Sequence, residues 1–557
     1  MSRAYTVALV GGGSIATSVL AQLARRIESL PALHLLQFEP ATRLGVGQPY
    51  APDLEAVLLN TPAAALSVLP QEPAHFTRWL QARADSDPAQ ARWLTGPVPR
   101  SVYGDYLADT YRQAVATLAA RQIPLSLIGE AVVDLVPTDF GATVLHTARG
   151  LRFTADEVVL CSGNLASSQY RDLVGQRGYL PSPYPCREMV KALAEADHVG
   201  IAGTSLSALD AIVSLHDSGF RGQITAFSRR GHLPSVRSDV SSPVTLRWFT
   251  REGIDALRCD AHGHVALDDL VHLLRLDIEA RTGEPFDLTQ ALAHGATPAE
   301  YLAGEIEIAR RGERHWQSVL YQTNEVIDHA WHRLSLADRR RFVAHHRHLF
   351  LVRRIAVPLV NAEKVLSMLR SGQLAVRGDV VAVTARREGF DINFGARDDA
   401  HHSAHRLTPP PASTCHVDHL VNATGMCVDV TRSDDPLIRQ LVARGLMTPC
   451  EFGGVRQQFE DLRLIGRHRD GEGAGDAHSQ RAPLAAQRWE PVVSLLGSLS
   501  VGTCFWTNAM SVNARLADRV VDAVLARACG ALAPTAGTSI APILPVIDAA
   551  RGVAATV

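Results

Sequence analysis

The feature that most constrains the fold is a glycine-rich segment, Val10-Gly11-Gly12-Gly13-Ser14-Ile15-Ala16. It follows an apolar run at residues 5–10 and precedes a helical pattern at residues 14–29. A second apolar run covers residues 33–38 and ends at Glu39. Strand, glycine turn, helix and strand in this order predict a βαβ unit that binds a dinucleotide.

Each position of this turn has a physical role in such a site. Gly11 permits the tight turn, and Gly13 lets the backbone approach a pyrophosphate. Ser14 and Ile15 begin the helix, whose N-terminus offers N–H groups and a positive dipole to phosphate oxygens. Glu39, at the end of the second strand, is placed to accept hydrogen bonds from a ribose.

A second unit of the same kind is expected farther along the chain. Residues 198–202 form an apolar strand pattern, residues 206–217 a helical one, and residues 223–227 another strand. The turn between the first two is a weakened glycine motif, because Ser205 replaces the second glycine. Serine still lets the backbone lie near a phosphate, so this turn suits a nicotinamide cofactor that binds and leaves. Its candidate contacts are Gly203, Ser205 and Leu206.

The residues after the second strand of this unit favour NADPH over NADH. They are Ser228, Arg229 and Arg230, and no acid is present to bind a free 2′-hydroxyl. Two guanidinium groups instead suit a 2′-phosphate. The alternative is two solvated arginines, since the chain has only two lysines, Lys191 and Lys364, and arginine carries nearly all its positive charge.

Two further strands end in turns of small residues. Residues 155–164 end at Gly163 and Asn164, and residues 418–425 end at Thr424 and Gly425. With these elements the chain resembles the FAD/NAD(P)-binding oxidoreductases that have two Rossmann-like domains. This class includes the flavin-containing and the N-hydroxylating monooxygenases.

Four ordered motifs make the resemblance more specific. They cover residues 44–50, 59–63, 75–80 and 98–107. As a series they resemble a bacterial subfamily of FAD-NAD(P)-binding proteins, some of whose relatives are similar to amino-acid N-monooxygenases, including aspartate N-hydroxylases. The resemblance implies further FAD contacts at Gly47, Gln48, Asn60, Ser67, Arg100 and Tyr103.

The segment Leu496–Asn508 precedes a predicted helix at residues 509–528. In the class that the chain resembles, such a turn brings a helix N-terminus to the flavin pyrimidine edge, where it stabilises negative charge on the reduced ring. Thr503 and Asn508 are the candidate polar contacts to the flavin. Trp506 either lines the substrate side or packs in the core.

The resemblance implies a monooxygenase that uses FAD, NADPH and O2 and acts through a C4a-hydroperoxyflavin. Its expected substrate is the amine of a small amino acid such as aspartate, in natural-product biosynthesis. Arginines would then bind the substrate carboxylates in bidentate fashion. The candidates are Arg237, Arg353 and Arg354, with Trp506 beside them.

Other functions remain open at this point. The chain could move hydride from NADPH through FAD without oxygen insertion, or be a Baeyer–Villiger or sulfur monooxygenase. The weakened motif at Ser205 also allows a non-catalytic nucleotide-binding scaffold.

Several classes are disfavoured by what the sequence lacks. Residues 40–100 contain no cysteine, which excludes a disulfide reductase with its redox pair after the first unit. The histidines at 345–348 and 401–402 lack the spacing of a metal site. The net charge of −2 argues against nucleic acid or an anionic membrane as the main partner. No run of about 18 apolar residues is present, so a soluble cytoplasmic protein is expected.

The expected fold is α/β, with two Rossmann-like domains and a helical insertion. We expect residues 1–185 and 355–530 to form the FAD domain, and residues 186–245 with 325–354 to form the NADPH domain. Residues 246–324 would be a helical insertion that caps the active site or forms a homodimer surface. A mobile loop is expected at 469–482 and a flexible tail at 531–557.

Overall fold

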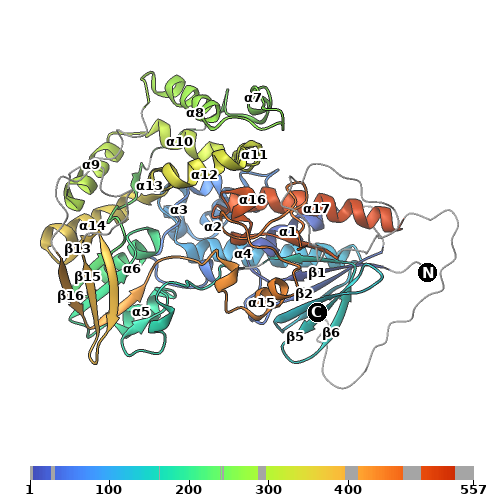
Figure 1. The fold of residues 1–557 in the computed structure, drawn as a ribbon, viewed down its shortest axis with the longest axis horizontal. Coiled ribbons are helices and arrows are strands. Elements are labelled where there is room, and N and C mark those ends of the chain that lie inside the picture. The colour runs from blue at the N-terminus through green and yellow to red at the C-terminus, as the bar shows by residue number, and fades with distance from the viewer. Residues whose placement is uncertain are drawn as a thin grey trace.

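The computed structural model describes residues 4–26, 32–161, 163–238, 240, 242, 244–286, 297–395, 412–467 and 491–532. The loop predicted at 469–482 lies outside these residues, and so does the predicted tail from residue 533 onward. The described chain forms two units, each built on a parallel sheet, with a group of helices along one side (Figure 1).

The first unit has a five-stranded parallel sheet in the order β18-β7-β1-β2-β3. Its strands are β1 (Tyr5–Val10), β2 (Leu33–Phe38), β3 (Leu125–Ile128), β7 (Glu157–Leu160) and β18 (Val492–Leu495). The central strands are mostly apolar because both faces of the sheet are covered, and Gln37 and Glu157 are buried polar exceptions. Val7 and Leu9 face one core cluster, and Ala8 between them faces another.

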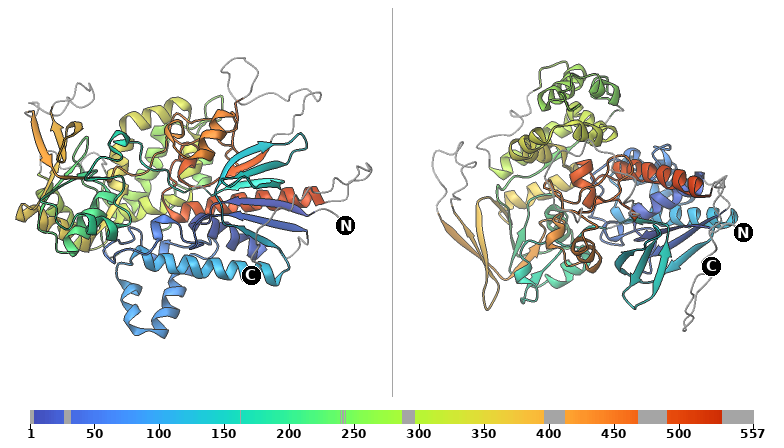
Figure 2. Two further views of the ribbon diagram at one scale, coloured as in Figure 1. Left: turned by 90° about the horizontal axis from the view of Figure 1, so that it is seen from below. Right: turned by 45° about the vertical axis from the view of Figure 1, so that its right-hand side comes forward.

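Helices cover one face of this sheet and a small antiparallel sheet covers the other (Figure 2). The helices are α1 (Ser14–Arg26), α4 (Arg100–Ala120) and α17 (Met510–Leu532). The antiparallel strands are β4 (Val132–Pro137), β5 (Thr143–Thr147) and β6 (Arg152–Ala155). Helix α15 (Pro436–Ala443) packs against β4. Two shorter helices, α2 (His75–Ser86) and α3 (Arg92–Thr95), lie before α4, and α16 (Val501–Cys504) lies before α17.

The second unit repeats this architecture with the strand order β13-β10-β9-β17-β8, again all parallel. Its strands are β8 (Tyr179–Leu180), β9 (His198–Ala202), β10 (Gln223–Phe227), β13 (Leu374–Arg377) and β17 (His419–Asn422). Its helices are α5 (Cys186–Ala192), α6 (Leu206–Asp217) and α14 (Leu359–Ser371). An antiparallel sheet of β14 (Val380–Ala385), β15 (Phe390–Phe394) and β16 (Ser413–Val417) packs against it.

The expected α/β fold with two Rossmann-like units is confirmed. The predicted strands at 5–10, 33–38, 198–202 and 223–227 and the predicted helix at 206–217 match the observed elements residue for residue. The first helix is described to Arg26, and the last runs from Met510 rather than residue 509.

The predicted domain boundary at residue 355 does not coincide with the division between the sheets. Strand β13 pairs with β10, and β17 pairs with β9 and β8, so the chain from residue 356 to 422 belongs to the second sheet. The sequence placed both closing strands, at 157–160 and 419–422, in the expected FAD domain. Their sequences look alike because each closes its own copy of the same fold.

The described residues between 251 and 354 form mainly helices, and the helical insertion expected at 246–324 covers the first part of this stretch. It contains α7 (Arg251–Asp255), α8 (Leu267–Thr282), α9 (Pro298–Arg310), α10 (His315–Gln322), α11 (Ile327–Arg333), α12 (Leu336–His345) and α13 (Arg347–Arg354). Helix α9 packs into the core of the second unit, beside the short sheet of β11 (Ser235–Arg237) and β12 (Ala356–Pro358).

Residues 325–354 had been predicted to belong to the NADPH domain, and their packing differs from that prediction. Trp331 and Phe350 join a separate cluster with helices α8 and α10, and Phe505 of the first unit completes it. Apolar side chains on α11 and α13 therefore bury themselves against the first unit rather than against the second sheet. In the described part of the chain, no helix is both long and apolar enough to cross a lipid bilayer.

Buried polar contacts join the two units. The Arg100 guanidinium, at the start of α4, lies 2.7 Å from the Asp210 carboxylate of α6 and donates to the Tyr184 hydroxyl at 3.3 Å. The Tyr184 hydroxyl in turn donates to Asp210 at 2.6 Å. Asp53 of the first unit accepts the N–H of Cys186 at 2.7 Å, at the start of α5. These contacts fix the orientation of the second sheet relative to the first.

We predict that replacing Asp210 by asparagine lowers the free energy of unfolding by about 3 kcal/mol, because it leaves the buried Arg100 charge without its partner. Denaturant unfolding followed by circular dichroism measures this change. Glu55→Gln, which breaks an exposed pair with Arg92, is the control and should cost less than about 1 kcal/mol. Equal effects of the two substitutions would contradict the role given to Asp210.

Candidate functional site

The first glycine turn lies at the carboxyl edge of the first sheet, between β1 and α1. Gly11 has φ +114°, and its N–H donates to the Phe38 carbonyl at 2.9 Å. A Cβ built on Gly11 would lie 2.5 Å from the carbonyl oxygen of Cys161, at the end of β7. Only glycine can therefore hold the chain this close to the neighbouring strand.

Glu39 is bound to this turn at the end of β2. Its carboxylate accepts the Gly12 N–H at 2.7 Å and the Ala41 N–H at 2.8 Å. These two bonds fix the side chain beside the glycines and leave acceptor capacity on both oxygens. Contact between Glu39 and ribose hydroxyls stays a prediction, and this position allows it.

A second loop closes over the turn. A Cβ on Gly13 would lie 3.3 Å from the Cα of Gly47, and the Gly45 N–H donates to the Gly12 carbonyl at 2.7 Å. The first helical hydrogen bond runs from the Thr17 N–H to the Gly13 carbonyl. The N–H groups that precede it, including those of Ser14 and Ile15, have no partner within the helix. This backbone cradle suits a pyrophosphate.

The second unit repeats two contacts of this turn. Gly203 has φ +131°, and its N–H donates to the Phe227 carbonyl at 2.8 Å. A Cβ on Gly203 would lie 2.5 Å from the carbonyl oxygen of Ala423, which follows β17. The carboxyl edge of the second sheet thus has a second glycine turn of the same geometry.

The serine in the weakened motif is the N-cap residue of α6. Ser205 is exposed and makes no side-chain capping bond, and Leu206 is the first helical residue. Its hydroxyl is therefore available to a ligand at the same helix end. Arg229 and Arg230 are exposed beyond the carboxyl end of β10. Ser228, which was grouped with them, uses its hydroxyl to accept the Gly231 N–H at 2.9 Å.

Both glycine turns lie near the two segments by which the chain passes from one unit to the other. One segment follows β7 and the other follows β17. Gly163 and Asn164 are exposed beyond the end of β7, and Leu165 pairs with Cys427 where the chain returns. Thr424 and Gly425 are exposed, and the Thr424 hydroxyl is 2.7 Å from that of Ser167. Since Thr424 follows β17, this predicted contact lies at the edge of the second sheet. Its position is between the two glycine turns rather than at the first.

Three predicted FAD contacts are used inside the protein instead. Ser67 is buried, and its hydroxyl donates to the Leu69 carbonyl at 2.8 Å. Tyr103 is fully buried in an aromatic cluster with Phe76. Arg100 joins the two units, as described above. Gln48 is exposed and Asn60 half-buried, so both remain accessible on the loops near the first turn.

The C-terminal element follows β18 at the same edge of the first sheet. The Ser498 hydroxyl donates to the Gly163 carbonyl at 3.5 Å, and Trp331 of α11 donates its indole N–H to the Gly502 carbonyl at 3.0 Å. Thr503 donates to the Val455 carbonyl at 3.5 Å, and Asn508 is exposed. The element therefore connects the first cradle to the helical region.

The predicted substrate residues lie close together but differ in their partners. Trp506 is half-buried, and the Arg354 guanidinium stacks over its ring at 4.8 Å. Arg353 points elsewhere and pairs with Glu305 at 3.4 Å. Arg237 is buried on β11, which pairs with β12 just after α13.

Three neighbours of Arg354 were not predicted from the sequence, namely Tyr321, Thr323 and Asn324. They lie in a helical stretch without a motif, and only the fold brings them to the guanidinium. The role of Asp210 could have been predicted from the sequence. A carboxylate on the apolar face of a helix must find a buried partner.

Among the described residues, three buried cysteines are protonated thiols. Burial raises the pKa of the Cys161, Cys186 and Cys504 thiols to about 12, which keeps them protonated. Within the same ranges, no three His, Cys, Asp or Glu side chains are grouped to hold a metal ion. The pair at 401–402 lies outside the described residues.

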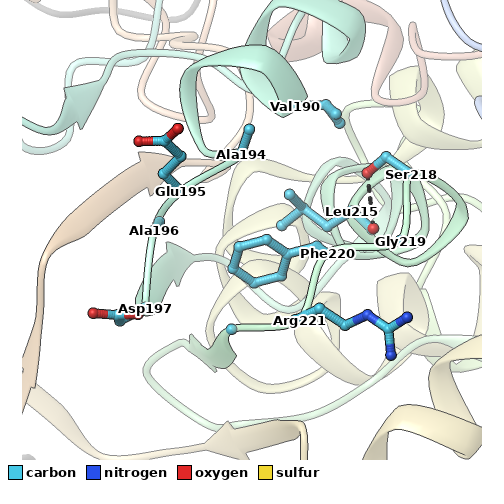
Figure 3. A pocket seen from close by; sticks show the side chains of 11 residues that line it. Val190, Ala194, Glu195, Ala196, Asp197, Leu215, Ser218, Gly219, Phe220 and Arg221 are labelled. Carbon is cyan, nitrogen blue, oxygen red and sulfur yellow. Dashed lines mark hydrogen bonds between the residues drawn. The ribbon is translucent and has the colours of Figure 1, made fainter.

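A pocket of about 360 Å³ lies at the opposite end of the second sheet (Figure 3). Phe220 and Arg221 line it from the segment before β10, and Glu195 and Asp197 line it from the segment before β9. It is at the amino edge of the sheet, away from Gly203. Since ligands of such sheets bind at the carboxyl edge, this pocket is separate from the cofactor site.

Comparison with known proteins agrees with this geometry. Residues 8–165 match a family model described as FAD-NAD(P)-binding. The chain is 23% identical over 419 residues to the uncharacterized protein YdhS of Escherichia coli (strain K12), covering 66% of this chain and 75% of that protein.

Solved structures share the fold over nearly the whole chain. L-lysine 6-monooxygenase from Pseudomonas syringae has a TM-score of 0.56 at 14% identity, with 94% of this chain and 100% of that chain covered. The reduced form of ornithine hydroxylase from Pseudomonas aeruginosa has a TM-score of 0.54 at 15% identity, covering 94% and 99%. The ornithine N-hydroxylase of Kutzneria sp. 744 has a TM-score of 0.51 at 12% identity, covering 94% and 100%. The resemblance to N-hydroxylating flavoproteins is confirmed in the fold.

We predict that Gly11→Ala yields protein with little bound FAD. The positive φ alone costs an alanine about 1–2 kcal/mol, and its Cβ would meet the Cys161 carbonyl. The ratio of flavin to protein absorbance after purification measures the loss. Gly129→Ala is the control, because no atom lies within 4 Å of the added Cβ and no positive φ is involved. Full flavin content in Gly11→Ala would contradict the assignment of this cradle.

Proposed function

We propose that the protein is an FAD- and NADPH-dependent monooxygenase that hydroxylates the amine nitrogen of a small amino acid such as aspartate. The observation that carries the proposal is the pair of matched glycine turns, at Gly11 and Gly203, near the segments that connect the two units. Two dinucleotides held there would meet at their reactive ends. The shared fold with lysine and ornithine hydroxylases supports amine oxidation as the reaction.

The residues of the first unit fit FAD. The backbone N–H groups after Gly13 would bind the pyrophosphate, and Glu39 would accept hydrogen bonds from the ribose. Met510 begins a 23-residue helix, whose N-terminal dipole favours negative charge on a nearby ring. When bound, FAD supplies the redox chemistry that passes electrons from NADPH to O2 and one oxygen atom to the amine.

The residues of the second unit fit a nicotinamide cofactor that carries a 2′-phosphate. Ser205 and the first turn of α6 would bind the pyrophosphate. Arg229 and Arg230 would contact the 2′-phosphate through their guanidinium groups. Both arginines are exposed, so the cofactor can enter and leave from solvent.

The helical region and the C-terminal element form an aromatic wall beside Trp506 that would help to exclude water there. Phe505 and Trp331 stack with ring centroids 4.9 Å apart, and Phe350 lies 5.7 Å from Phe505. This aromatic wall joins the C-terminal element to α11 and α13. A dry site is needed because oxygen transfer competes with the loss of peroxide to water.

We expect replacement of both Arg229 and Arg230 by alanine to raise the KM for NADPH about 10- to 100-fold, since each charged hydrogen bond contributes roughly 1.5–3 kcal/mol before solvent screening. Steady-state NADPH oxidation measures this effect. The KM for NADH, which has no 2′-phosphate, should not change. Arg221→Ala, an exposed arginine of the same unit near its opposite edge, is the matched control. An unchanged preference for NADPH would contradict the assignment.

The reaction itself is tested by product analysis. Purified protein should be yellow, and NADPH should bleach the flavin under argon. In air, a screen of amino acids and diamines with mass detection should find one substrate that gains a single oxygen atom on nitrogen. If every amine gave hydrogen peroxide and no oxygenated product, the protein would be an NADPH oxidase rather than a monooxygenase. A protein that takes up no FAD would contradict the proposal as a whole.

A further inference from the structure

Two neighbouring arginines at the end of α13 are both buried, but only one has a carboxylate partner. Arg353 is 1% exposed and pairs with Glu305 at 3.4 Å. Glu305 also binds Arg314 at 2.6 Å and accepts the Val236 N–H at 3.0 Å. Arg353 therefore shares a carboxylate with Arg314 inside the protein, although its Nε and Nη2 atoms have no hydrogen-bond partner.

Arg354 is 2% exposed, and no carboxylate among the described residues lies within ion-pair distance of it. Its guanidinium donates to the Thr323 hydroxyl at 2.9 Å and to the Asn324 side-chain oxygen. Both partners are neutral. The Nε atom is buried and has no hydrogen-bond partner at all.

The remaining neighbours of Arg354 are aromatic rings. The guanidinium carbon lies 4.8 Å from the Trp506 ring centre and 5.4 Å from that of Phe350. Burial raises the pKa of the nearby Tyr321 phenol, so this group stays neutral as well. The same loss of hydration lowers the pKa of Arg354 to about 9, and the side chain remains charged at neutral pH.

Arg339 shows how this protein otherwise accommodates an arginine without an ion pair. It stacks over Trp331 at 5.5 Å, and it donates to the carbonyls of Trp331 and His332 at 3.0 and 2.7 Å. Those carbonyls end helix α11, where the helix dipole is negative. The hydrogen bonds of the Arg354 guanidinium go instead to a hydroxyl and a side-chain amide, and a buried charge without a counter-ion is strongly unfavourable.

The position of Arg354 indicates what would supply the missing charge. Trp506 belongs to the element that follows β18 at the carboxyl edge of the first sheet, next to the proposed flavin site. We infer that Arg354 is the receptor for an anionic group of the amine substrate, a carboxylate in the first instance. This inference rests on the proposed function, and it favours amino acids with a free carboxylate over diamines.

The test uses succinate, which has two carboxylates and no amine, with the oxidised FAD-loaded protein and no NADPH. Calorimetry should show that wild type binds succinate and that Arg354→Gln binds it roughly 30-fold or more weakly, as expected when one partner of a buried charged pair is removed. Arg354→Lys should retain part of the affinity. Arg339→Gln, the matched control, should bind as wild type does.

The thermal midpoint separates a receptor from a structural residue. Without succinate, Arg354→Gln should unfold at or above the wild-type temperature, because it removes an uncompensated buried charge. Succinate should raise the midpoint of wild type and not that of the variant. Equal succinate affinity in both proteins, no binding to wild type, or a lowered midpoint with binding intact would each overturn the inference.

Failure of the inference and failure of the proposed function give different results. Succinate binding through Arg354 with no N-oxidised product from any amine would retain the anion receptor and reject the monooxygenase. Hydroxylation of a diamine, undiminished in Arg354→Gln, would retain the monooxygenase and reject the receptor.

Discussion

The arrangement of both units depends on one close contact between a glycine and a neighbouring strand. In each unit the carbonyl at the end of a parallel strand occupies the space that a Cβ would need, 2.5 Å from that position at Gly11 and at Gly203. The contact lets the chain turn directly from strand into helix. It also leaves the helix N-terminus open at the sheet edge, where an anion can bind.

The same contact sets the chain order of the whole molecule. The carbonyl next to Gly11 comes from Cys161, and the one next to Gly203 comes from Ala423. Each residue lies where the chain leaves one unit for the other. Each glycine turn is therefore in contact with a segment that connects the two units. The ion pair of Arg100 with Asp210 holds the two units in a fixed orientation.

Local patterns in the sequence predicted the elements well but not how they associate. Strands 5–10 and 198–202 were recognisable because an apolar run, a glycine turn and a helix follow one another within a few residues. Membership of a sheet depends instead on pairing between distant segments, so the strand at 419–422 was placed in the wrong unit. For the site, the glycine turns and Glu39 were predictable from position in the motif. Ser67 and Tyr103 were not, because their side chains turn into the core.

The roles of the arginines could not be predicted from the sequence and depend on the structure. In a chain with two lysines, almost every cationic site must be an arginine, so residue type alone does not distinguish structure from function. Partners do. Arg353 and Arg314 share Glu305, and Arg515 and Arg519 hold the buried Asp328 between them. In each case the fold encloses a carboxylate with the charge. Arg354 is enclosed with rings, a hydroxyl and an amide, and the fold leaves its counter-ion to come from a ligand.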